Sequence, residues 1–267
     1  MNKNISIAVA VAVIVGGLAA YLYWPEPEPE PVQVQAPPPP PPPPPTPEPE
    51  APQVVEAPPA APALPALSDS DKLVLDALAG LVGNKSLMKV FHTERIIQNF
   101  VATIDNLPGR RAPMRVMPVE RASGEFITAG PEDDLVISPM NADRYTPYVK
   151  IAAAVDAKKL VGLYVRLYPL FQQAYEKLGY PKKYFNDRLI VVLDNLLAAP
   201  DIKEPVRLVQ PNVFYLYADP DLEKRSIGQR ILMRTGSKNE TKIKAKLREI
   251  KKELLLNMRD KKVVSAG

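Results

Sequence analysis

Residues 157–178, AKKLVGLYVRLYPLFQQAYEKL, decide the fold class of this chain. Apolar side chains recur there at spacings of three and four residues, which is the pattern of one buried face of an α-helix. Asp156 stands directly before the run, where its side chain can cap a helix, and Gly179 follows it, where a helix commonly ends. The stretch therefore predicts the longest helix of a mainly α-helical domain.

Helical periodicity continues on both sides of this stretch. Further helices are predicted over residues 71–82, 86–104, 148–154, 186–199, 220–233 and 237–257. Residues 110–147 carry Pro and Gly at short intervals and predict an irregular stretch with one short hairpin. Residues 206–209 and 213–217 are rich in β-branched and aromatic side chains and are expected to be extended. The fold class is thus mainly α with a few short strands.

The N-terminal part has a different composition. Residues 5–24 form an uncharged run of twenty residues, which spans about 30 Å as a helix and so matches a bilayer core. Tyr21, Tyr23 and Trp24 close the run as an interfacial aromatic cluster would. We therefore predict a transmembrane anchor, although small residues at 17–19 also suit a cleaved signal peptide.

Flanking charge gives the expected orientation of this anchor. Lys3 precedes the run, and the residues just after it are acidic. Positive charge is retained on the cytoplasmic side of a membrane. We therefore expect a single-pass protein of the bacterial inner membrane, with its N-terminus in the cytoplasm and its C-terminal domain in the periplasm.

Proline dominates the segment that follows. Twenty of the 32 prolines fall in residues 25–67, nine of them consecutive at 37–45, together with six Glu and no basic residue. Such a composition cannot form a core and favours an extended polyproline II spacer. The expected organisation is an anchor with its cytoplasmic tip (1–24), a disordered spacer (25–67) and a helical domain (68–267). The spacer is either a passive tether or a docking site for a protein that binds polyproline II.

Charge and cysteine content restrict the possible partners. The chain has no Cys, which excludes disulfides and thiolate metal sites. Residues 222–262 carry 14 basic and 5 acidic side chains, and the six Glu of the spacer offset most of this excess to leave the chain a net charge of +4. The last helix is therefore either an ordinary solvated helix or a contact surface for anionic lipid, an acidic partner or the acidic spacer. Because the domain is expected outside the cytoplasm, we expect no nucleic-acid partner.

A series of short segments is similar to a known family. The segments are 105–108 (DNLP), 168–175 (YPLFQQAY), 178–181 (LGYP), 184–189 (YFNDRL), 207–211 (RLVQP), 217–220 (YADP) and 244–250 (KAKLREI). In this order they resemble the bacterial family known as domain of unknown function 3014, over about residues 91–252. The resemblance implies the same layout of anchor, proline-rich spacer and outer domain. It brings no catalytic residues to this chain.

No catalytic constellation is evident from the residues. His92 is the single histidine, placed in a predicted helix, and no Gly-x-Ser-x-Gly elbow or phosphate loop occurs. The acidic cluster at 132–134 lacks a calcium-loop pattern and is expected to be a solvated turn. Asp187 and Asp194 are one candidate carboxylate pair for glycan cleavage. The helical rise places them about 10 Å apart, which is long for general acid–base catalysis. We predict a domain that is not an enzyme and has no catalytic residue, metal or cofactor.

One candidate binding site remains. Tyr164, Tyr168 and Tyr175 share a helix face, because they are spaced by four and seven residues. They form either a core stripe or an aromatic groove for a glycan or an extended peptide. The candidate groove comprises Tyr164, Tyr168, Tyr175, Asn186, Asp187, Arg188 and Arg207.

Two functions follow as hypotheses. The first is a non-enzymatic interaction or scaffold module of the cell envelope, which rests on the anchor, the spacer and the lack of a catalytic constellation. The second is a membrane-tethered protein that binds or acts on peptidoglycan, which rests on the carboxylates and tyrosines. The expected partners are the bilayer through residues 5–24 and either an envelope protein or peptidoglycan.

Overall fold

The computed structural model describes residues 63–84, 86–203 and 205–264. The predicted anchor and almost all of the predicted spacer lie outside the described residues. Among the described helices, none has both the length and the apolar character needed to cross a membrane. Leu67 is buried in the core, so packing begins at the end of the range assigned to the spacer.

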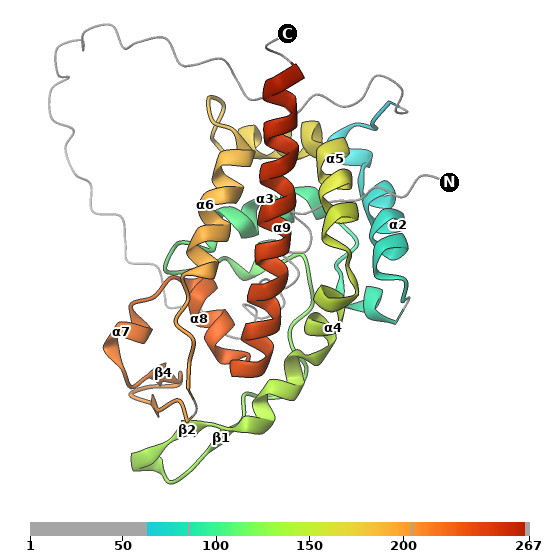
Figure 1. Ribbon diagram of the computed structural model, residues 1–267. Coiled ribbons are helices and arrows are strands. Elements are labelled where there is room, and N and C mark those ends of the chain that lie inside the picture. Colours follow the sequence, from blue (N-terminus) through green and yellow to red (C-terminus); the bar gives the residue numbers. More distant parts are fainter. Residues whose placement is uncertain (1–62, 85, 204, 265–267) are drawn as a thin grey trace, which may run out of the picture.

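The described chain is mainly helical, with two short β-hairpins (Figure 1). The α-helices are α2 (Asp71–Val82), α3 (Ile96–Asn106), α4 (Thr146–Ala154), α5 (Ala157–Lys177), α6 (Phe185–Leu197), α7 (Pro220–Glu223), α8 (Ile227–Arg234) and α9 (Ser237–Val264). The 3₁₀ helices are η1 (Leu67–Asp69), η2 (Leu87–Val90), η3 (Met114–Val116), η4 (Glu132–Asp134) and η5 (Pro139–Tyr145). The strands are β1 (Thr128–Ala129), β2 (Val136–Ile137), β3 (Leu208–Val209) and β4 (Leu216–Tyr217).

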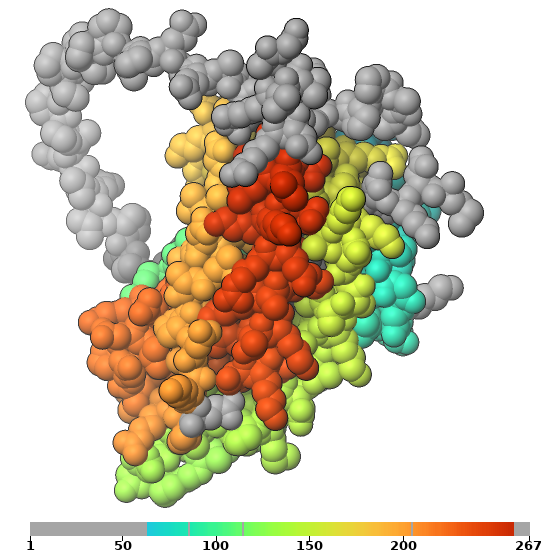
Figure 2. Space-filling model, in the orientation of Figure 1, coloured from blue at the N-terminus to red at the C-terminus, as the bar shows by residue number. Residues whose placement is uncertain are grey.

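Helix α9 packs against α4, α5 and α6, and in Figure 1 it runs between α5 and α6 with α3 behind them. Figure 2 shows its outward face at the surface of the molecule. Its inward face carries Ile243, Leu247, Ile250 and Leu254, all buried and spaced by four, three and four residues. At 28 residues α9 is longer than α5, which has 21, so the prediction that α5 is the longest helix is wrong. Lysines interrupt the apolar stripe of α9, so the sequence pattern predicts a shorter helix than the structure contains.

Helix α5 forms where the sequence predicts it. Asp156 Oδ1 accepts a hydrogen bond of 2.8 Å from the Lys159 backbone N–H and so caps the first turn. Gly179, just beyond the end, has a φ of 116°, a conformation that side chains with a Cβ rarely adopt. Helix α6 is likewise confirmed, to within two residues at each end.

The helix predicted over residues 86–104 is wrong, because the chain breaks it into η2 and α3. Phe91 between them is extended and pairs with Val119 in an isolated antiparallel bridge. Arg95 has a φ of 51° and turns the chain into α3. Asp71, from the start of α2, then accepts hydrogen bonds from the backbone N–H groups of Arg95 and Ile96, at 2.7 and 2.9 Å. The carboxylate of Asp71, which is distant in sequence, therefore caps the start of α3.

The helix predicted over residues 220–233 is also divided, into α7 and α8. Ser226 is extended there, with ψ of 156°, and its Oγ accepts a hydrogen bond from the backbone N–H of Gln229 at 3.3 Å. The same hydroxyl donates to Asn195 Oδ1 on α6 at 2.7 Å. Ser226 therefore caps α8 and fixes it to α6.

Helix α8 lies very close to α3 and α6 at Gly228. Its backbone N–H donates to the carbonyl oxygen of Leu107, at 2.9 Å. A Cβ at this position would lie 2.6 Å from Leu196 Cδ2 and 3.1 Å from that carbonyl oxygen. Any larger residue at this position would therefore displace Leu196 and the end of α3, so glycine favours the close approach of these helices.

The two hairpins form a second, smaller core below the helices in Figure 1. Strands β1 and β2 pair antiparallel, as do β3 and β4, and an isolated bridge between Val136 and Arg207 joins the two sheets. The buried Arg234 guanidinium lies 5.3 Å from the ring centre of Phe126 and 5.2 Å from that of Tyr217. The predicted hairpin within residues 110–147 is thus confirmed. The extended segments predicted at 206–209 and 213–217 are confirmed in part, because they contain β3 and β4, but Val213 and Phe214 lie in the bend between these strands.

Candidate functional site

The three tyrosines of the predicted groove are core residues. The exposed fraction is 0% for Tyr164 and 3% for both Tyr168 and Tyr175. Tyr164 makes edge-to-face contacts with Tyr168 and Phe171, with ring centres 5.8 and 5.5 Å apart. The helical spacing correctly predicted that the three rings share one face of α5. It did not show that α6 and α9 pack beside this helix. Of the two interpretations of these tyrosines, the core stripe is therefore confirmed and the open aromatic groove is wrong, because the rings are covered.

The polar atom of Tyr164 is also used inside the domain. Its hydroxyl donates to Asn186 Oδ1 at the start of α6, and both side chains are fully buried. Burial raises the pKa of the Tyr164 hydroxyl well above its ordinary value. The group therefore stays protonated and remains a hydrogen-bond donor, which suits a structural role.

Gln172 joins α5 to the start of α6. Its Oε1 accepts hydrogen bonds from the Tyr168 hydroxyl at 3.0 Å and from the Phe185 backbone N–H at 2.9 Å. Its Nε2 donates to the Lys183 carbonyl oxygen and to a Glu176 carboxylate oxygen, both at 2.9 Å. One side chain thus caps α6 and fixes the loop before it. Gln172 lies in one of the family segments but was not among the predicted site residues.

Arg188 and Asp105 link α6 to α3. Arg188 Nε donates to Asp105 Oδ1 at 2.7 Å, and its guanidinium also donates to the Asp105 carbonyl oxygen. The Tyr180 hydroxyl donates to Asp105 Oδ2 at 3.1 Å, and this hydrogen bond raises the pKa of Tyr180. The Tyr180 ring stacks on Tyr175, with ring centres 4.6 Å apart. Asp105 therefore joins the members of this cluster, but it was not among the predicted site residues.

We expect Asp105→Ala to lower the free energy of unfolding by about 2 kcal/mol, because Arg188 and Tyr180 lose a half-buried charged acceptor. Asp187→Ala is the matched control, since Asp187 is exposed and directly precedes Arg188 on α6; its effect should stay within about 0.5 kcal/mol. Urea denaturation of both variants measures the difference. Equal stabilities would show that Asp105 does not hold the helices together.

The remaining predicted residues do not complete a binding site. Arg207 lies in the hairpin region, where its Nε is 3.3 Å from Asp134 Oδ1 and its side chain is 72% exposed. Asp194 pairs with Lys251 of α9, and Asp187 is exposed. His92 lies between η2 and α3, not on a helix as expected, with Nδ1 at 3.3 Å from Glu120 Oε1.

The acidic cluster forms the short helix η4. All three of its residues, Glu132 to Asp134, are exposed. Within the described ranges, no group of three or more His, Cys, Asp or Glu side chains is placed to hold a metal ion.

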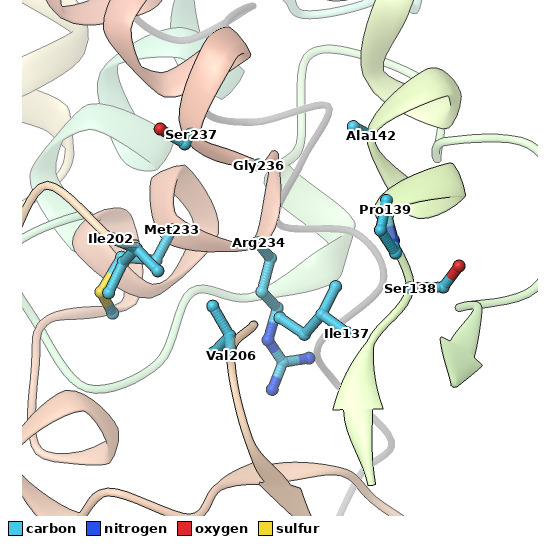
Figure 3. Close-up of a pocket in the computed structure, with 10 residues that line it drawn as sticks. All are labelled: Ile137, Ser138, Pro139, Ala142, Ile202, Val206, Met233, Arg234, Gly236 and Ser237. Atoms are coloured by element: carbon cyan, nitrogen blue, oxygen red, sulfur yellow. The ribbon is translucent and has the colours of Figure 1, made fainter. Parts of the chain in front are cut away.

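Two cavities lie beside the start of α9. The smaller, of about 10 Å³, has room for about one water molecule. Figure 3 shows side chains of β2, η5, α8 and the segment at 202–206 around it, with Arg234 reaching between Ile137 and Val206. The larger, of about 760 Å³, is an open groove between α4 and the first turns of α9. Neither Asp187 nor Asp194 lines either of them.

Comparisons with known proteins identify the family but assign no activity. No curated protein and no solved structure matches the chain. The family described as "Protein of unknown function (DUF3014)" matches residues 96–251, which is more than half of the sequence. The match runs from the start of α3 to Lys251 within α9, and it includes Asp105, Gln172, Tyr180 and Arg188. The chain therefore belongs to the DUF3014 family.

Proposed function

We propose that this chain is a single-pass protein of the bacterial inner membrane, whose helical domain acts in the periplasm as a non-enzymatic interaction module. Residues 5–24 anchor it, and the proline-rich spacer carries the domain away from the bilayer. Its partner is a protein of the cell envelope.

The observation that carries the proposal is an exposed apolar hairpin. In the segment from β3 to β4, exposed fractions reach 76% for Val213, 45% for Val209 and 37% for Phe214. Neighbouring large apolar side chains at the surface are typical of protein contact sites. The segment projects from the end of the domain where the hairpins lie (Figure 1). We infer that this hairpin tip contacts the partner.

The polar residues support an interaction role over catalysis. Asp105, Gln172, Arg188 and Asn186 each bond to another part of the helical core. Side chains engaged in this way hold helices together and are not directed at a substrate. The alternative of a glycan-acting protein loses its main support, because the tyrosines expected to stack on sugar rings are buried.

The partner surface is tested by site-specific photocrosslinking of the full chain in its own membrane. A photoreactive residue replaces Val213 in one variant and Gln173, an exposed residue of α5, in the control. We expect a discrete crosslinked protein from position 213 that is absent from position 173. Equal products from both positions would contradict the assignment of the hairpin, and crosslinks to peptidoglycan alone would favour the glycan alternative.

The anchor is tested separately. The full chain should stay in the membrane fraction after a carbonate wash, and a reporter fused after Gly267 should be active only outside the cytoplasm. A protein released by the wash, or a cytoplasmic reporter, would overturn the location without touching the fold.

A further inference from the structure

The open groove between α4 and α9, called here the α4–α9 groove, has an unusual combination of charge and shape. Small apolar residues, Ala142, Val149 and Ala153, line it together with Lys150 of α4 and Lys238 and Lys242 of α9. Its single acidic lining residue is Asp143. The groove is thus a basic channel with an apolar component and a volume of about 760 Å³.

The lysines of the groove differ from three other lysines of α9. Those three lysines form ion pairs: Lys244 with Glu240 and Asp201, Lys246 with Glu249, and Lys251 with Asp194. By contrast, Lys150, Lys238 and Lys242 are exposed, and within the described part of the chain none of them forms an ion pair.

Gathering three unpaired cations along one groove raises the local positive potential, and a bound polyanion lowers it. The ligand that this groove fits is therefore an extended acidic segment with small apolar side chains. It must be narrow enough to lie between two helices, and its carboxylates must be spaced so that several reach the lysines.

The chain itself contains such a segment. Residues 26–56 carry six Glu and no Lys or Arg, and their other residues are mostly Pro, with Ala, Val and Gln. Glu alternates with Pro at 26–30 and 47–50, so the segment presents repeated carboxylates on a narrow apolar chain. Its charge and its side-chain size therefore complement those of the α4–α9 groove.

The length of the intervening chain permits the contact. Residues 31–62 lie between the first acidic block and the described domain, and as polyproline II they span up to about 100 Å. A domain of about 200 residues has a radius of gyration of about 17 Å. The first acidic block can therefore reach any face of the domain, whereas residues 51–62, which separate the second block from the domain, span up to about 37 Å.

We propose that the acidic part of the spacer, residues 26–56, docks in the α4–α9 groove of the same chain. The docked spacer is folded back on the domain and shortens the tether. High salt, or a competing acidic partner, releases it and lets the domain reach further. This contact goes beyond the proposed envelope function, and it does not depend on the exposed hairpin.

Zero-length carbodiimide crosslinking of the full chain in detergent micelles tests the contact. The reagent activates a Glu carboxylate, a lysine Nζ attacks it, and an amide forms as the carbodiimide takes up the elements of water as a urea. We expect crosslinks from Glu of residues 26–56 mainly to Lys150, Lys238 and Lys242. They should fall several-fold in about 1 M salt, where screening acts within about 3 Å. Crosslinks spread evenly over all exposed lysines, or joining two chains, would overturn the proposal.

A second measurement does not depend on lysine chemistry. Because the chain has no Cys, Thr46→Cys and Thr241→Cys provide two unique sites for a donor and an acceptor dye. The triple variant Lys150→Gln, Lys238→Gln, Lys242→Gln should lower the transfer efficiency. A matched triple variant at the exposed Lys89, Lys158 and Lys182, which lie outside the groove, should leave it unchanged. An efficiency that is the same in both triple variants would also overturn the proposal.

Discussion

Phe171→Ala should lower the free energy of unfolding by about 3–5 kcal/mol, which is the range for removing a fully buried aromatic ring. Phe171 has no exposed surface, and its ring lies at the centre of the aromatic cluster that joins α5 to α6. It stacks on Phe185 with ring centres 5.8 Å apart and meets the Tyr164 ring edge to face. Neighbours held by hydrogen bonds, such as Tyr164, cannot move far into the space left by the ring. Urea denaturation followed by far-ultraviolet circular dichroism measures the loss.

Two further variants test whether the loss comes from the cavity, since alanine has a higher helix propensity than phenylalanine and so cannot cause it through the helix. Phe171→Leu keeps part of the volume and should cost less than Phe171→Ala. Gln173→Ala changes an exposed position of the same helix and should alter stability by at most about 0.5 kcal/mol. A loss for Phe171→Ala that is no larger than for Gln173→Ala would show that the cluster does not contribute to the stability of the domain.

The helices that the sequence predicted well are those whose signals are local. Helix α5 has its apolar stripe, its capping Asp156 and its terminating Gly179 within one continuous stretch. The break at residues 91–95 has a different origin. It depends on Val119 pairing with Phe91 and on Asp71 capping α3, and both partners are distant in sequence. Periodicity in one segment cannot reveal such contacts.

The candidate site shows the same limit. The spacing of Tyr164, Tyr168 and Tyr175 predicted a common face, but spacing alone does not say whether another helix covers it. Three consecutive residues of α6 lie in different environments. Asn186 is buried, Asp187 is exposed, and Arg188 pairs with Asp105 of α3. The Arg188 partner, Asp105, lies 83 residues earlier in the chain. Only the family segments marked it, without indicating its role.

Lys244→Met should lower the free energy of unfolding by about 3–5 kcal/mol near neutral pH, the range for breaking a buried ion pair. The side chain of Lys244 is 2% exposed, and its Nζ lies 2.9 Å from Glu240 Oε1, which is equally buried. Its other contacts are Asp201 Oδ1 at 2.7 Å and the Ala199 carbonyl oxygen. Methionine fills a similar volume without a charge, so the variant leaves Glu240 buried and unpaired. Urea denaturation gives the loss.

The size of this loss should depend on pH. Burial raises the pKa of Glu240 in the folded state, so the folded protein holds this proton more tightly than the unfolded chain. Stability from this group therefore falls as pH rises from the ordinary Glu range through the raised pKa. Without Lys244 the pKa rises further, which makes the variant progressively less stable towards neutral pH.

Asp201 also makes the stability difference between Lys244→Met and the wild type larger towards neutral pH. The hydrogen bond from Lys244 lowers the pKa of Asp201, so this pair stabilises the wild type above the ordinary Asp range and ceases to do so in acid. Lys244→Met lacks that contribution at every pH. The stability difference between variant and wild type should therefore shrink as pH falls from about 8 to about 4. A difference that stays constant would show that Glu240 is not charged in the folded protein.

Adding Glu240→Gln to Lys244→Met isolates the buried carboxylate as the cause. The double variant has no unpaired buried charge, and it should recover much of the stability lost by Lys244→Met near neutral pH. Its stability should also vary less with pH than that of Lys244→Met, because it no longer contains the unpaired carboxylate whose raised pKa makes the single variant less stable towards neutral pH. If the double variant were as unstable as the single one at every pH, the cost would lie in packing around position 244. Recovery would instead show that the pair is retained in α9 because each charge compensates the other, not because a buried charge is favourable there.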